Sequence, residues 1–123
     1  MPEVVRIVTF NVHHCRGRDG KVDVDRIARV LRGTEAQLVA LQELDRGVAR
    51  SGGTDQVETL GSALGMPLFF RPTVELQGGR YGIAFGSSLP FEARGLDLPR
   101  LGREEQRAAI VAEVAAPRSS API

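Results

Sequence analysis

Ile7-Val8-Thr9-Phe10-Asn11 and Leu38-Val39-Ala40-Leu41-Gln42-Glu43 are the two stretches that decide the fold of this chain. Each is a short apolar run that ends in polar side chains, a pattern typical of a buried strand that reaches the edge of a sheet. We predict that the two strands are neighbours, so their ends bring Asn11 and Glu43 to one site. Asn11 is the only asparagine in the chain.

The residues between these strands predict a helix. Asp23 is a suitable N-cap, and Ile27, Val30 and Leu31 recur at the spacing of an apolar helix face. Gly33 fits the position just after the last turn. A strand, a helix and a second strand predict an α/β arrangement.

A second helix is predicted after a charged, glycine-rich segment. Thr54 offers an N-cap, Val57, Leu60 and Leu64 would face inward, and Gly65 would end the helix. The helix is therefore expected to pack on the sheet through one apolar stripe.

The remaining pattern predicts strands joined as a meander, with a hairpin turn at Gly78-Gly79 and a second turn at Ser87-Ser88. Including the first strand, the expected strands cover Val4–Val12, Leu38–Leu41, Leu68–Arg71, Tyr81–Gly86, Phe91–Arg94 and Arg107–Val114. The expected loops cover His13–Lys21 and Asp45–Thr54. We predict one domain over residues 1–114 and a disordered tail over residues 115–123.

Composition narrows the classes of function. The 123 residues are 42% hydrophobic and 25% charged, which is typical of a globular domain. With 16 basic and 15 acidic residues, the net charge of +1 disfavours binding of nucleic acid through bulk electrostatics. No apolar run is long enough to span a membrane, and no secretory signal is evident, so cytoplasmic localisation is the expectation.

Glu43 and Asn11 are the strongest candidates for a chemical role. A carboxylate at the end of an apolar strand suits Mg²⁺, which takes one or two carboxylates together with substrate phosphate oxygens. The amide of Asn11 can orient a carboxylate or a phosphate oxygen. The structural alternatives are a strand-end acid that faces water and an amide that caps a turn.

Other candidates are weaker. His13-His14-Cys15 is predicted to be extended, so its side chains would alternate in direction and could not share one metal ion, although one imidazole could contact a phosphate. Arg50 and Arg107 could bind phosphate through their guanidinium groups, but most arginines are simply solvated. Cys15, the single cysteine, reads as a buried or incidental thiol.

Taken together, the segments Ile7–His14, Leu38–Asp45 and Tyr81–Phe85 resemble the first half of the endonuclease/exonuclease/phosphatase family, the DNase I-like hydrolases. Arg107–Val114 is similar to the strand that follows the family's hairpin. The resemblance implies part of a four-layered α/β sandwich, with the family's C-terminal half absent.

The resemblance also implies a metal-dependent phosphoesterase that cleaves phosphodiester or phosphomonoester bonds with Mg²⁺ or Mn²⁺. Glu43 would be a metal ligand, Asn11 would organise the metal and the phosphate, and His14, Arg107 and Tyr81 would contact phosphate. The substrate would be a phosphoester of unknown type, nucleic acid included, and the oligomeric state is open.

The chain departs from the family pattern in one respect that bears on activity. Relatives carry a Gly-Asp-Phe/Leu-Asn segment and a terminal Ser-Asp-His segment, whereas here both histidines precede residue 15. The isolated chain is therefore expected to be impaired or inactive. The alternatives are a non-catalytic remnant that binds phosphate or metal, and an unrelated small α+β protein in which Asn11 and Glu43 are structural.

Overall fold

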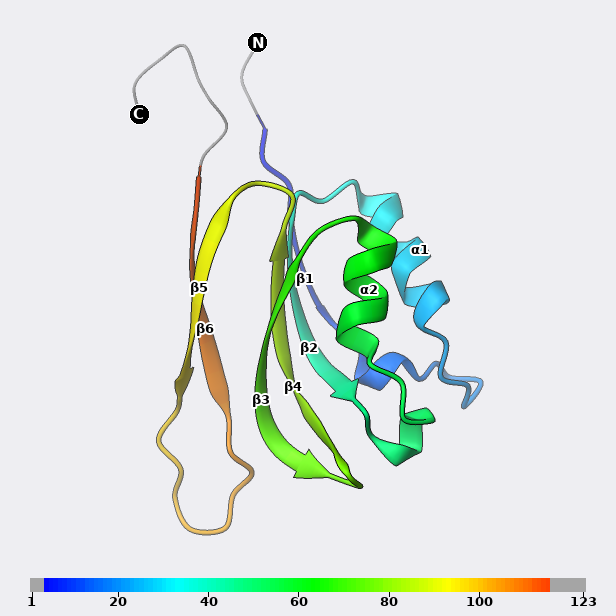
Figure 1. The fold of residues 1–123 in the computed structure, drawn as a ribbon, viewed down its shortest axis with the longest axis vertical. Helices are drawn as coiled ribbons and strands as arrows, with labels where there is room; N and C mark the ends of the chain where they lie inside the picture. The colour runs from blue at the N-terminus through cyan, green and yellow to red at the C-terminus, as the bar shows by residue number, and fades with distance from the viewer. Residues whose placement is uncertain (1–3, 116–123) are drawn as a thin grey trace.

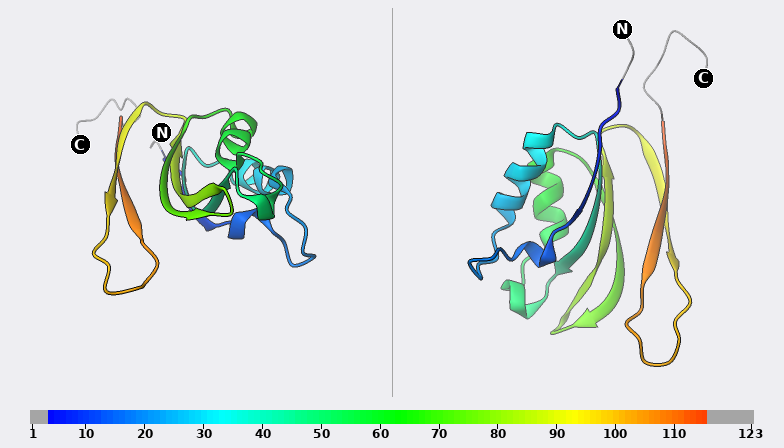
Figure 2. Two further views of the ribbon diagram at one scale, coloured as in Figure 1. Left: turned by 60° about the horizontal axis from the view of Figure 1, so that its bottom comes forward. Right: turned by 180° about the vertical axis from the view of Figure 1, so that it is seen from behind.

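The computed structural model describes residues 4–115, which form three layers (Figure 1). Helices α1 (Val24–Thr34) and α2 (Gln56–Leu64) cover one face of a four-stranded sheet. Strands β5 (Phe91–Asp97) and β6 (Ala108–Val114) form a second sheet on the other side, as the turned views of Figure 2 also show. The predicted α/β class with two helices is confirmed.

The larger sheet has the strand order β1-β2-β4-β3. Its strands are β1 (Ile7–Asn11), β2 (Leu38–Arg46), β3 (Leu68–Leu76) and β4 (Gly79–Ser87). The first two strands run parallel and adjacent, as predicted, and their register pairs Asn11 with Gln42. Parallel pairing therefore brings Asn11 close to the Glu43 backbone.

Side chains along β1 point alternately toward the core and toward the opposite face of the sheet. Val8 and Phe10 pack against the core between sheet and helices, whereas Ile7 is 64% exposed and Thr9 is also exposed. The core contains apolar residues from both helices, the central strands and the segments that join them, namely Val12, Cys15, Ala28, Leu31, Val39, Leu41, Leu44, Val57, Leu60, Met66 and Ala84.

Helix α1 begins where the sequence predicts and ends later. The Asp23 carboxylate accepts a hydrogen bond from the Arg26 backbone N–H at 3.0 Å, so Asp23 is the N-cap. The prediction that Gly33 follows the helix is wrong, because helical bonding continues to Thr34 and Glu35 takes the left-handed conformation. Val30 also departs from the predicted buried stripe, since it is 51% exposed.

Helix α2 ends at Gly65 as predicted, with a φ of 67° that favours glycine. Its N-cap is Asp55, so the assignment of Thr54 is wrong. The Asp55 carboxylate accepts from the Glu58 backbone N–H at 3.1 Å and also pairs with Arg46 at 3.1 Å. The ion pair gives Asp55 a contact that a threonine could not provide.

Strand β2 does not stop at Leu41, so the prediction that Glu43 lies at a strand end is wrong. Pairing with β4 resumes at Leu44, which is fully buried, after one extra residue has been inserted into β2. Glu43 lies in this bulge with a φ of 62°. Leu44 and Asp45 are both buried, so the strand rejoins the sheet directly after Glu43. The extra residue is accommodated by the left-handed conformation of Glu43.

The predicted meander is also wrong, because the chain changes sheets after β4. Strands β3 and β4 form the predicted hairpin, but β4 pairs with β2 on its other side. Since both edges of β4 are occupied, β5 cannot join it and pairs with β6 instead. Phe85 and Phe91 meet edge-to-face at 5.2 Å between the two sheets.

The segment after β1 contains a tight turn within the expected loop. His13, His14 and Cys15 have φ values of 50°, 39° and 62°, so the prediction of an extended segment is wrong. Such left-handed backbone costs about 1–2 kcal/mol per residue and needs compensation. The turn places His14 and Cys15 in the interior, where Cys15 is a buried free thiol.

No helix within residues 4–115 is both long and apolar enough to cross a membrane. The predicted tail falls, apart from Ala115, outside the described residues, and the Ala115 backbone N–H donates to Pro90 O at 2.8 Å.

A buried carboxylate ties the end of β2 to the segments that follow it. Asp45 is 0% exposed and accepts from Arg50 Nε and Nη2, each at 2.9 Å, and from Ser51 Oγ at 2.5 Å. Its backbone N–H donates to Gln56 Oε1 at 3.0 Å, and Gln56 Nε2 donates to the His14 carbonyl at 2.8 Å. This network therefore supports both β2 and the left-handed turn.

We predict that Asp45→Ala lowers the free energy of unfolding by about 2–4 kcal/mol, because Arg50 and Ser51 lose their buried partner. The Arg50 side chain is 31% exposed and can recover some hydration, which limits the loss. Urea unfolding followed by circular dichroism measures it.

Asp97→Ala is the matched control for this prediction. Asp97 also pairs with an arginine, at 2.6 Å from Arg71, but its side chain is 60% exposed, so a loss below about 1 kcal/mol is expected. Equal losses in the two variants would contradict a special role of the Asp45 network.

Candidate active site

A pocket of about 410 Å³ lies where the larger sheet meets the end of the second sheet. Four of the five predicted site residues line it, namely Asn11, Glu43, Tyr81 and Arg107. They come from β1, β2, β4 and the residue before β6, so segments distant in sequence converge here. Their convergence is a structural fact, whereas their chemical roles stay predictions.

Two bulges shape the floor of this pocket, one on each side of Gly82. Strand β2 carries its extra residue between Leu41 and Leu44, and β3 carries one between Pro72 and Val74. A Cβ on Gly82 would overlap Arg71 O and lie 2.8 Å from Pro72 Cα, so only glycine fits. Bulges re-aim side chains, and residues from both bulges line the pocket.

Glu43 and Tyr81 interact inside the pocket. Burial, the adjacent Glu43 carboxylate and the negative charge of Glu105 together raise the pKa of Tyr81 above its ordinary value. The phenol therefore stays protonated at neutral pH and can donate a hydrogen bond. A carboxylate beside a protonated phenol can bind a cation while the phenol binds an anionic oxygen.

Asn11 has a structural role in addition to its place in the pocket. Its Oδ1 accepts from the His13 backbone N–H at 3.1 Å, so the side chain caps the left-handed turn. The amide keeps both N–H donors and a second lone pair on Oδ1. The turn-capping alternative is thus present in the structure, and it leaves the amide able to bind a ligand.

Arg107 lines the pocket together with its neighbours Leu98 and Gln106. Gln106 Nε2 donates to Leu98 O at 2.9 Å and to Arg107 O at 2.8 Å, and the Leu98 backbone N–H donates to Arg107 O at 2.9 Å. These bonds close the neck of the loop between β5 and β6. The position of Arg107 at the pocket is therefore fixed through its backbone.

Of the five residues that the resemblance assigns to the site, His14 alone does not line the pocket. It is 7% exposed, and its ring centroid lies 4.7 Å from that of His13. Burial and the charge of Arg50 lower the pKa of His14, which favours a neutral imidazole. Its predicted contact with phosphate stays a prediction that the lining of the pocket does not support.

Polar residues that had not been singled out for a role also line the pocket, namely Gln42, Thr73, Glu105 and Gln106. Gln42 and Gln106 directly precede Glu43 and Arg107 in the sequence, so their adjacency to predicted site residues could have identified them. Thr73 had none, because its position depends on a bulge in β3. Glu105 adds a second carboxylate to the pocket.

The donor atoms of this pocket suit a hard divalent cation. They are carboxylate and amide oxygens, which Mg²⁺ prefers, and Mg²⁺ is typically held by one or two carboxylates with waters and phosphate completing its shell. Within residues 4–115 no cluster of three or more His, Cys, Asp or Glu side chains could hold a metal by itself. The residues therefore fit Mg²⁺ shared with a substrate, not an all-protein metal cage.

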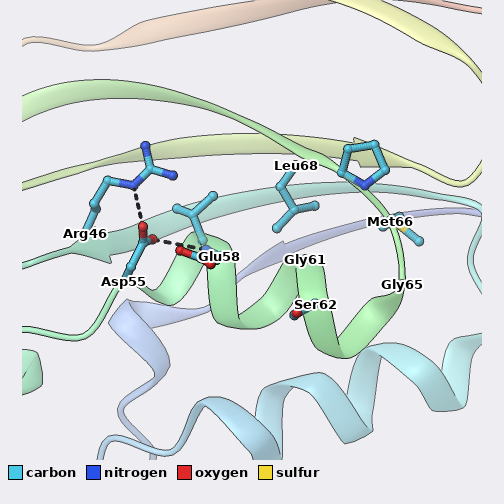
Figure 3. Close-up of a pocket in the computed structure, with 10 residues that line it drawn as sticks. Arg46, Asp55, Glu58, Gly61, Ser62, Gly65, Met66 and Leu68 are labelled. Carbon is cyan, nitrogen blue, oxygen red and sulfur yellow. Dashed lines mark hydrogen bonds and ion pairs between the residues drawn. The ribbon is translucent and has the colours of Figure 1, made fainter.

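A larger cavity of about 520 Å³ lies elsewhere, between α2 and the start of β3 (Figure 3). The Arg46–Asp55 ion pair lies at one end, and Gly61, Ser62 and Gly65 lie along the helix. None of the predicted site residues lines this cavity, so the smaller pocket is the better candidate site.

Comparisons with known proteins bear on the family. A search among curated proteins finds no significant match. Among solved structures, the chain is similar to an endonuclease/exonuclease/phosphatase from Beutenbergia cavernae DSM 12333, with a TM-score of 0.77 and 26% sequence identity. The similarity covers 92% of this chain and 35% of that one, so the chain spans about a third of the neighbour's length.

This similarity confirms the predicted partial α/β sandwich of the DNase I type and argues against the unrelated α+β protein. The model of the endonuclease/exonuclease/phosphatase family matches residues 8–122, which include every predicted site residue. On these grounds, the chain belongs to the endonuclease/exonuclease/phosphatase family.

Proposed function

We propose that this chain forms the metal- and phosphate-binding part of a phosphoesterase active site. The observation that carries the proposal is the convergence of Asn11, Glu43, Tyr81 and Arg107 on one pocket. Family membership supports a phosphoester as the substrate class. The near-zero net charge favours a substrate that is bound locally through few charged contacts.

Each residue has a role that follows from its chemistry. Glu43 would supply a carboxylate ligand for Mg²⁺ or Mn²⁺, and the amide of Asn11 would orient the phosphate of the substrate. Tyr81 donates a hydrogen bond from its neutral phenol, and Arg107 pairs with a phosphate oxygen. When bound, the cation would neutralise charge that develops on the phosphoryl oxygens.

The same pocket limits what the chain can do alone. Among the described residues its lining contains no histidine, the side chain that most often positions and deprotonates an attacking water. We propose that these described residues bind and orient a phosphoester without completing hydrolysis. The alternative is a module that binds phosphate or metal and serves no catalytic purpose.

The pairing of Glu43 with Tyr81 can be tested by titration, because Tyr81 is the only tyrosine. Its ionisation in the wild type should occur above the ordinary value near 10. In Glu43→Gln the pKa should fall, since a nearby carboxylate disfavours the phenolate, yet burial and Glu105 should keep it elevated. Ultraviolet difference absorbance measures the phenolate directly.

Glu113→Gln is the control for this titration, because Glu113 is exposed on β6 and does not line the pocket. Its titration curve should match the wild type. Superimposable curves for wild type and Glu43→Gln would show that the carboxylate does not reach the phenol.

Metal binding can be followed with the same residue, since the chain contains no tryptophan and all phenol fluorescence comes from Tyr81. Mg²⁺ should change the fluorescence saturably by drawing Glu43 away from the phenol. Glu43→Gln should weaken the affinity by about tenfold or more, as expected for loss of a ligand or its close support. Calorimetry provides an independent affinity.

The control is again Glu113→Gln, which should bind as the wild type does. If Glu43→Gln bound Mg²⁺ with undiminished affinity, Glu43 would be removed from the metal site and the proposed function would fail.

Catalysis by the isolated chain is the third test. With Mg²⁺ and either a generic phosphodiester or DNA, turnover should stay near the background without enzyme, because a positioned general base typically contributes about 10²–10⁴ in rate. Phosphate release is measured with and without a chelator. Robust metal-dependent turnover that Glu43→Gln abolishes would show that the pocket is already complete.

A further inference from the structure

Besides Glu43, the Tyr81 ring contacts Arg50, a residue that does not line the pocket. Arg50 Cζ lies 5.2 Å from the centroid of the Tyr81 ring, within the range of a cation–π contact. Arg50 does not line the pocket, whereas Tyr81 and Glu43 do. The guanidinium therefore contacts a ring that lines the pocket without lining the pocket itself.

Arg50 is itself held at several points. Its Nε and Nη2 donate to the two carboxylate oxygens of Asp45, each at 2.9 Å, which fixes the plane of the guanidinium. Its backbone N–H donates to Gln77 Oε1 at 2.8 Å, which links it to the hairpin between β3 and β4. A lysine could preserve the charge but not this two-point geometry.

From this geometry we propose that Arg50 is a positioning residue, which holds the Tyr81 ring beside Glu43 and so sets the shape of the candidate site. The inference rests on the proposed function, because it matters for ligand binding only if Glu43 and Tyr81 act there. Asp45 contributes by orienting Arg50 from the interior. The buried network and the pocket are thereby coupled through one aromatic ring.

The competing explanation is that the Arg50–Asp45 pair serves stability alone. Arg46 offers a matched comparison, because it makes the same two kinds of contact elsewhere. Its Nε lies 3.1 Å from Asp55 Oδ2, in the pair drawn in Figure 3, and its Cζ lies 4.8 Å from the Phe70 ring centroid. If such contacts serve stability alone, Arg46→Lys and Arg50→Lys should have the same effect on the Tyr81 dichroism band and on the Mg²⁺ affinity.

The test compares Arg50→Lys and Arg46→Lys by the near-ultraviolet circular dichroism of Tyr81, the only tyrosine in a chain without tryptophan. Arg50→Lys should lose most of the tyrosine band because the ring is no longer fixed, whereas Arg46→Lys should retain it. Far-ultraviolet spectra and thermal unfolding establish that both variants are folded. An unchanged tyrosine band in folded Arg50→Lys would overturn the proposal.

Ligand binding provides the second readout. Mg²⁺ affinity, measured by calorimetry, should fall in Arg50→Lys and stay unchanged in Arg46→Lys. Equal affinities in wild type and Arg50→Lys would also overturn the proposal. If the wild type binds no Mg²⁺, the proposed function fails, but the dichroism comparison still decides whether Arg50 fixes the ring.

A measurement on the wild type covers the case in which Arg50→Lys does not fold. A guanidinium over an aromatic face is shielded by the ring current, so the side-chain protons of Arg50 should resonate upfield of the other arginines in nuclear magnetic resonance spectra. Ordinary shifts for Arg50 would show that the contact is absent in solution and would refute the proposal.

Discussion

The burial of one carboxylate, Asp45, is the constraint on which the rest of the structure depends. A fully buried charge is tolerated only when it is paired and its lone pairs are satisfied. Burial raises the pKa of Asp45, but hydrogen bonds from Arg50 and Ser51 outweigh this effect and hold the pKa below its usual range. The segment after β2 must therefore fold back over the strand end, and Gln56 then links α2 to the turn at His14.

The same constraint accounts for the strained backbone near the candidate site. Leu44 and Asp45 must reach the interior, so β2 accommodates an extra residue and Glu43 adopts a positive φ. The cost, about 1–3 kcal/mol for such a conformation, is offset by buried contacts on both sides of it. Glu43 thereby leaves the regular pleat and reaches the pocket, where it meets Tyr81. The strained backbone and the candidate site thus coincide in position because both follow from the bulge.

Local sequence signals predicted most elements, and several of their failures lie where a contact with another segment decided the outcome. Asp23 as an N-cap and Gly65 as a C-terminal residue depend on local backbone chemistry, which the sequence displays. Asp55, and not Thr54, caps α2, and Asp55 is also held by an ion pair with Arg46, which is nine residues away. The exit of β5 from the sheet depended on the occupation of both edges of β4. Apolar periodicity within one segment carries no information about an ion pair with another segment or about the sheet that a strand joins.

By itself the sequence determined the two adjacent parallel strands, the two helices, the candidate residues Asn11 and Glu43, and the family that their motifs resemble. These features depend on apolar periodicity and on side-chain types, which are local properties of the chain. Only the tertiary structure decided that Glu43 lies in a bulge, that Tyr81 and Arg107 share its pocket, and that His14 is buried away from it. These outcomes depend on the register between strands and on the packing of two sheets, which no single segment encodes.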